Sequence, residues 1–90
     1  MSRRYPSTNG RMIVFKEFYL GDVEDPQLYA GFPISEWEKT EHGNWVMNHA
    51  IEPPMWQTFV DYNSYGYQVR IYGKLTEADE IIYHLKFAHL

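Results

Sequence analysis

The chain contains no cysteine, which excludes disulfide bonds and thiolate metal ligands. None of its apolar runs approaches the roughly 20 residues that a helix needs to cross a bilayer. Arg3 and Arg4 near the N-terminus are not followed directly by an apolar stretch of signal-peptide length. We therefore expect a soluble, cytoplasmic protein that does not bind membranes.

Catalytic motifs are absent as well. The sequence has no nucleophile elbow, no phosphate-binding glycine loop and no dinucleotide fingerprint. Nothing in the sequence places the acid pairs Glu24 with Asp25 and Glu36 with Glu38 in an apolar pocket, and such pairs are typical of a turn and of a helix N-terminus. We expect a non-enzymatic protein without a cofactor.

The histidine spacing does not indicate a metal site. His42 and His49 are seven residues apart, which on a continuous helix separates them by about 10 Å along the axis. His84 and His89 are five apart, which on a strand places them on opposite faces. Neither pair has zinc-like spacing, so we expect no bound metal.

Basic residues are scarce in the middle of the chain. The net charge is −4, and residues 17–52 contain eight acids against Lys39 alone. Such a segment would repel a phosphate backbone and suits a basic protein surface. Arg70, Tyr72 and Lys74 could stack and pair with single-stranded nucleic acid, but three residues form a small platform beside so many acids, and nucleic acid is the less favoured partner.

Ninety residues make one domain with a single core. We expect residues 1–11 to form a flexible polar tail and residues 12–90 to form the domain. Residues 12–20 are rich in β-branched and aromatic side chains and predict a strand. The following stretch, through Pro33, has the turn composition of a loop.

Residues 35–50 predict a helix. Ser35 and Glu38 have the spacing of a capping box. One predicted helical face, spaced by four residues, consists of Trp37, Glu41, Trp45 and His49. The prediction allows a break at 42–44, around Gly43, and Pro53 with Pro54 ends the element.

Residues 55–62 and 67–75 predict a β-hairpin with its turn at 63–66. Its second strand alternates, with Tyr67, Val69 and Ile71 on one face. Thr76 then has the character of a helix cap. After a short helical turn, the alternation through Phe87 favours a last strand, and a single C-terminal helix is the alternative.

The predicted order is β-α-β-β-(short α)-β. It corresponds to an α+β two-layer sandwich with about four antiparallel strands, and it is compatible with a ferredoxin-like topology. The second helix is too short to cover its half of the sheet, so a partner or a second copy would cover the remaining apolar surface.

Sixteen aromatic residues are more than such a core can bury. Trp37, Trp45, Trp56 and Phe59 are the best candidates for the interior. Tyrosine and phenylalanine near acids and at the hairpin turn are typical of an interface. The predicted partner-binding residues are Asp22, Glu24, Asp25, Tyr29, Phe32, Tyr62, Tyr65 and Tyr67.

Three segments, 21–26, 45–50 and 65–67, have a compact style rich in tyrosine, tryptophan and turn residues. In this style, over residues 12–90, the chain resembles small accessory proteins of tailed bacteriophages. The resemblance implies a viral protein that binds and redirects or inhibits a bacterial host factor in the host cytoplasm, and it assigns no functional residue. We expect a protein-binding regulator or inhibitor whose partner has a basic surface. The alternatives are a homo-oligomeric structural or assembly subunit and a single-stranded nucleic-acid binder.

Overall fold

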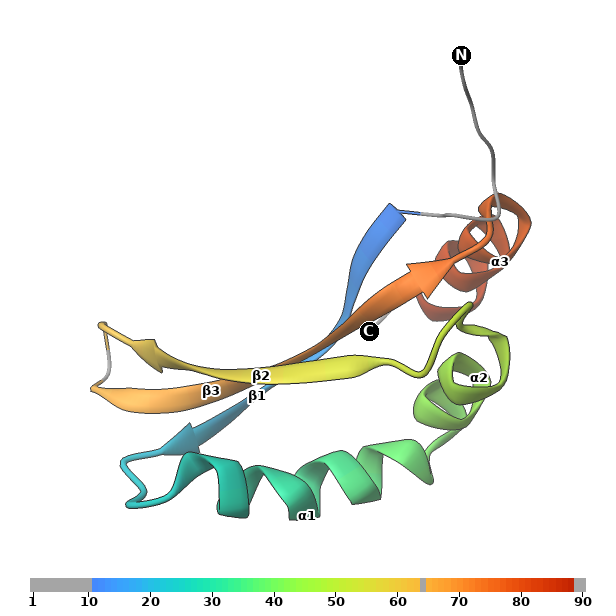
Figure 1. The fold of residues 1–90 in the computed structure, drawn as a ribbon. Coiled ribbons are helices and arrows are strands. Elements are labelled where there is room, and N and C mark those ends of the chain that lie inside the picture. Colours follow the sequence, from blue (N-terminus) through green and yellow to red (C-terminus); the bar gives the residue numbers. More distant parts are fainter. Residues whose placement is uncertain (1–10, 64, 89–90) are drawn as a thin grey trace.

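The computed structural model describes residues 11–63 and 65–88, which fold into an α+β domain with the order β-α-α-β-β-α. The strands are β1 (Arg11–Gly21), β2 (Met55–Asp61) and β3 (Gly66–Leu75), and the helices are α1 (Pro26–Glu38), α2 (Glu41–His49) and α3 (Glu77–Phe87). Figure 1 shows α1 along one face of the sheet, α2 and α3 at one end, and the β2–β3 turn at the other end.

The sheet is antiparallel, with β3 in the centre and the order β1-β3-β2. Alternate residues of β3, among them Val69, Ile71 and Leu75, are buried, because successive side chains of a strand point to opposite faces. The register of β1 shifts between Val14 and Lys16. Phe15, the extra residue of this bulge, is buried. The predicted hairpin and its alternation are confirmed.

Helix α1 begins in the segment that we predicted as a loop. The Asp25 carboxylate accepts a hydrogen bond from the backbone N–H of Leu28, and Pro26 occupies the start of the helix, where proline is favoured. Ala30, Ile34 and Trp37 then recur at helical spacing and are all buried. Their burial offsets Pro33 inside the helix, so the loop prediction is wrong.

The predicted single helix over 35–50 is two helices. Ser35 lies inside α1 and does not cap it, and the break falls at Lys39 and Thr40 instead of 42–44. The Thr40 hydroxyl accepts from the backbone N–H of Gly43 and so begins α2. Of the predicted four-residue repeat, Glu41, Trp45 and His49 lie on α2, where the ring centroids of Trp45 and His49 are 4.0 Å apart, whereas Trp37 belongs to α1.

The C-terminal segment is a helix, which confirms the alternative and not the predicted last strand. Thr76 caps α3 as expected, its hydroxyl accepting from the backbone N–H of Asp79. Helical spacing buries Glu80, Tyr83 and Phe87, whereas the strand pattern would also have buried Leu85, which is exposed. The sheet therefore has three strands, and the ferredoxin-like topology is wrong.

The predicted tail, residues 1–11, lies outside the described residues except for Arg11, which begins β1. In the part of the chain that the structure describes, no helix has the length and apolar character required to cross a membrane. The described molecule is elongated, with extents of 46 × 31 × 21 Å.

Candidate protein-binding surface

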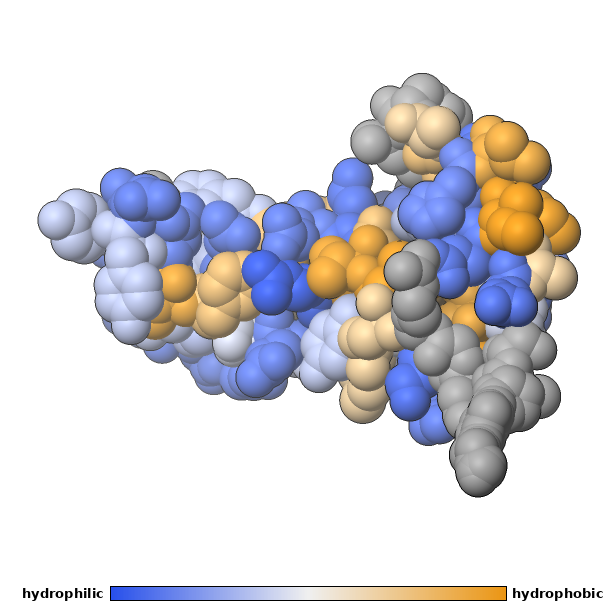
Figure 2. Space-filling model, turned by 90° about the horizontal axis from the view of Figure 1, so that it is seen from above, coloured by the Kyte–Doolittle hydropathy of each residue, from blue (hydrophilic) through white to orange (hydrophobic). Residues whose placement is uncertain are grey.

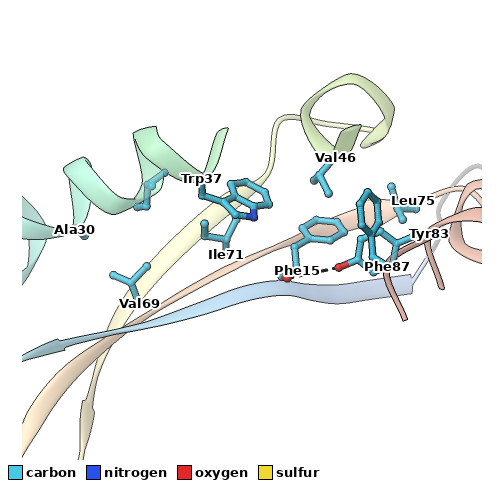
Figure 3. Close-up of a cluster of buried hydrophobic side chains, with 10 residues drawn as sticks. Phe15, Ala30, Trp37, Val46, Val69, Ile71, Leu75, Tyr83 and Phe87 are labelled. Atoms are coloured by element: carbon cyan, nitrogen blue, oxygen red, sulfur yellow. Dashed lines mark hydrogen bonds between the residues drawn. The ribbon is translucent and has the colours of Figure 1, made fainter. Parts of the chain in front are cut away.

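The core takes up only part of the aromatic content. Figure 3 shows the buried cluster, in which Phe15, Trp37, Tyr83 and Phe87 are the aromatic members. The interior position of Trp37 is confirmed, and Trp45 and Phe59 are half-buried. Trp56 is 37% exposed, so its assignment to the core is wrong. Many of the remaining rings lie at the surface.

Two of these rings project from the β2–β3 turn. Tyr62 is 86% exposed and Tyr65 is 84% exposed. The turn is held by hydrogen bonds to Asp61: its carbonyl accepts from the backbone N–H of Tyr65 over 2.9 Å, and its carboxylate accepts from that of Asn63 over 3.0 Å. Local hydrogen bonds thus hold a turn whose two rings face solvent.

A second apolar group lies on the outer face of α1. Leu28 is 72% exposed, Tyr29 56% and Phe32 75%. They face away from the buried Ala30 and Ile34 because a helix turns about 100° per residue. Helix α1 is thus apolar on both faces, which is unusual for a helix at a protein surface.

The structure brings the turn and the start of α1 to one end of the molecule (Figure 1). Gly66 lies so close to Gly21 that a Cβ atom added at Gly66 would be 2.9 Å from the carbonyl carbon of Gly21. Gln27 on α1 donates to the Thr58 hydroxyl on β2 over 3.2 Å. Segments far apart in the sequence therefore meet at this end.

We call this region the acidic–aromatic end. Its members, all exposed, are Asp22, Glu24, Asp25, Tyr29, Tyr62 and Tyr65. Phe32, also predicted to bind the partner, is exposed midway along α1 and lies outside this end. Tyr67, the remaining predicted residue, is half-buried on β3. Residues 17–38 contain six acids and residues 55–69 contain one, with no lysine or arginine in either segment. The net negative charge of these segments favours a basic partner.

A groove lies beside Phe32, between β1 and α1. It has a volume of about 550 Å³, and its lining is Lys16, Phe18, Phe32, Pro33, Glu36, Trp37, Thr40 and His42. Most of this lining is apolar, so the groove can accept an apolar side chain from a partner. The groove was not expected from the sequence, because Phe32 and Pro33 were predicted to lie in a loop.

His42 belongs to a buried hydrogen-bonded network. Trp37 Nε1 donates to His42 Nδ1 over 3.1 Å, and His42 Nε2 lies 2.9 Å from the Tyr83 hydroxyl. An indole N–H can only donate, so Nδ1 carries no proton and Nε2–H donates to Tyr83. Burial, and secondly the charge of Lys16, lowers the pKa of His42 below its ordinary value of 6.5. Among residues 11–63 and 65–88, no group of three or more potential metal ligands is present.

Arg70, one of the two bases of the face considered for nucleic acid, is engaged in other contacts. Arg70 Nε lies 2.7 Å from the Glu17 carboxylate, and the Arg70 guanidinium lies 4.5 Å from the centre of the Phe59 ring. The ion pair reduces the charge available to a phosphate. This face is therefore a poorer candidate than the acidic–aromatic end.

No protein-family model matches the chain, and no curated protein or solved structure is significantly similar to it. Functional inference therefore depends on the surface chemistry of the chain itself.

Proposed function

We propose that this protein is a non-enzymatic regulator or inhibitor that binds another protein through its acidic–aromatic end. The observation that carries the proposal is the exposure of Tyr62 and Tyr65, 86% and 84%, at an end of the molecule without bases in the adjoining segments. Tyrosine rings are frequent binding hot spots because each buries a large area at a low entropy cost.

The chemistry of this end defines the partner. Asp22 and Glu24 attract a basic surface, and the exposed rings require apolar pockets or flat apolar patches on that surface. The resemblance to small accessory proteins of tailed bacteriophages supports a bacterial host factor as the target. Binding there would redirect or block the host factor by covering its basic surface.

Affinity capture from bacterial lysate tests this function. The wild-type chain is compared with the double variant Tyr62→Ala/Tyr65→Ala, and Met47→Ala is the control because Met47 is an exposed apolar residue on α2. We expect wild type and control to retain the same basic protein and the double variant to lose it. Truncation of a hot-spot side chain reduces the binding free energy by more than about 1 kcal/mol. We therefore expect the double variant to lose affinity at least about tenfold.

Circular dichroism on all three chains separates loss of binding from loss of folding. Equal capture by the folded double variant and by wild type would reject the surface that we assign.

A further inference from the structure

Helix α3 has a second apolar face that no part of the described chain covers. Tyr83 and Phe87 face the core, whereas Ile81 is 62% exposed, Ile82 47% and Leu85 80%. With about 100° of rotation per residue, the exposed residues form one stripe opposite the buried face. We call Ala78, Ile81, Ile82 and Leu85 the outer stripe. Figure 2 shows apolar residues gathered at the end of the molecule where α3 lies.

Acidic and basic side chains border the outer stripe in a regular order. Glu77 and His84 follow one flank, and Asp79 and Lys86 follow the other, by the same helical geometry. On both flanks the acid lies in the first turn and the base lies in the last turn. Each flank is thus complementary to its own reversed copy.

We propose that the outer stripe binds the outer stripe of a second copy of this chain, antiparallel, about a two-fold axis close to Ile81 and Ile82. In a two-fold antiparallel helix pair each flank faces the same flank of the other copy in reverse. Glu77 then lies near His84 of the other copy, and Asp79 lies near Lys86. The centre of the Glu77–His84 pair is two residues before that of the Asp79–Lys86 pair, so an axis midway between the two centres places Ala78 against Leu85 and leaves the partners of each pair about 3 Å apart along the helices.

A second copy in the antiparallel arrangement fits this face better than one in a parallel arrangement. Parallel pairing would place acid against acid and base against base, and would align the helix dipoles unfavourably. Antiparallel self-pairing satisfies both flanks and covers the apolar stripe with an identical stripe.

The existing contacts of the flanking residues are compatible with this pairing. Lys86 Nζ lies 3.3 Å from the Glu41 carboxylate and His84 Nε2 lies 3.6 Å from that of Glu80. An ammonium group has three donors, so Lys86 can donate to Glu41 and to a second carboxylate at the same time.

A single pair of short helices buries less than the roughly 1,200 Å² of standard stable complexes. The dimer is therefore in equilibrium with the monomer.

Sedimentation velocity over a concentration series tests the proposal. The wild-type chain is expected to change from monomer to dimer as its concentration rises. Ile81→Glu and Leu85→Glu are expected to raise the dissociation constant of the dimer at least about 100-fold, because each lost apolar contact occurs twice in a two-fold interface. Leu28→Glu is the matched control, since Leu28 is 72% exposed and Leu85 is 80% exposed. The control should dimerise as wild type does.

The substituted side chains are exposed, so both variants are expected to fold, and thermal melting of each variant checks this directly. A wild-type chain that stays monomeric at the highest concentration, or Ile81→Glu and Leu85→Glu chains that dimerise normally, overturns the proposal. The result is independent of the proposed function, because none of these outcomes involves a partner of the acidic–aromatic end.

Cross-linking tests the orientation, and the absence of native cysteine makes it specific. Mixed Ala78→Cys and Leu85→Cys chains should form disulfide-linked dimers between the two variants. Ala78→Cys alone should not, because the antiparallel axis separates its two copies by about 10 Å along the helices, beyond disulfide reach. Efficient cross-linking of Ala78→Cys with itself would contradict the antiparallel arrangement.

Discussion

Trp37 and His42 are joined by a buried hydrogen bond across the break between α1 and α2, with 3.1 Å between indole Nε1 and imidazole Nδ1. The same imidazole reaches Tyr83 on α3 through Nε2, over 2.9 Å. One neutral histidine thus connects three helices. Its two ring nitrogens are both satisfied, which is what a buried polar group requires.

Removing the Tyr83 hydroxyl should therefore cost stability. Tyr83→Phe keeps the ring but leaves His42 Nε2–H without its acceptor in a buried site. We expect the free energy of unfolding to fall by about 1–3 kcal/mol, measured by urea denaturation. Tyr62→Phe is the control. Because Tyr62 is 86% exposed, this substitution should leave the free energy of unfolding almost unchanged. Equal effects of the two substitutions would argue against the network.

Stability should decline below pH 6.5. Burial and the charge of Lys16 hold the pKa of His42 below its ordinary value of 6.5 in the folded protein. Between the folded and unfolded pKa values the unfolded chain binds more protons, so the stabilisation is complete above pH 6.5 and decreases as pH falls. Urea denaturation on both sides of pH 6.5 measures this slope.

The control for the pH dependence is His42→Gln, whose amide can accept from Trp37 and donate to Tyr83 but does not titrate. We expect a shallower decline for this variant just below pH 6.5. An unchanged slope would assign the pH dependence to other groups.

Replacement of two glycines by alanine should change the stability of the fold in opposite directions. At Gly43 a Cβ would overlap the carbonyl oxygen of Trp37 and lie 2.8 Å from the Glu38 Cα, whereas at Gly31 nothing lies within 4 Å. Gly43→Ala should destabilise the fold by about 1–3 kcal/mol or more, because the contacts are with backbone. Gly31→Ala, inside α1, should stabilise it by about 0.5–1 kcal/mol. Thermal melting compares them, and a tolerated Gly43→Ala would contradict the close packing of α1 on α2.

Charge should affect the rate of association with the partner more than the lifetime of the complex. Asp22→Asn/Glu24→Gln removes two exposed charges from the acidic–aromatic end. We expect slower association and a weaker dependence on salt, with a small change in dissociation, because long-range attraction mainly steers encounter. Surface plasmon resonance at two salt concentrations measures both rates. Glu52→Gln, an exposed acid outside this end, is the control and should leave both rates unchanged.

The hairpin and the cap at Thr76 could be predicted from sequence because their signals are local. The alternation through Val69 and Ile71 and the turn residues around Asn63 act over a few positions. The conformation of the C-terminal segment, by contrast, depends on tertiary packing. Ile81, Tyr83, Leu85 and Phe87 alternate as a strand would, but the buried positions are those of a helix packed on Phe15.

The sequence of α1 contains helix signals, but Pro33 within it favoured the loop prediction. Asp25 followed by Pro26 is a favourable helix start, and Ala30, Ile34 and Trp37 have helical spacing. The surplus of rings, by contrast, could be judged from composition, and the exposure of Tyr29, Phe32, Tyr62 and Tyr65 confirms it. The groove beside Phe32 could not be foreseen, since it depends on how α1 packs against β1.

The most direct test of the acidic–aromatic end is an NMR titration of the labelled chain with the captured basic partner. We predict the largest backbone shift changes at Asp22, Glu24, Tyr62 and Tyr65, followed by those on the first turns of α1. Changes confined to α3 or to the Arg70 face of the sheet, with none at the β2–β3 turn, would contradict the account.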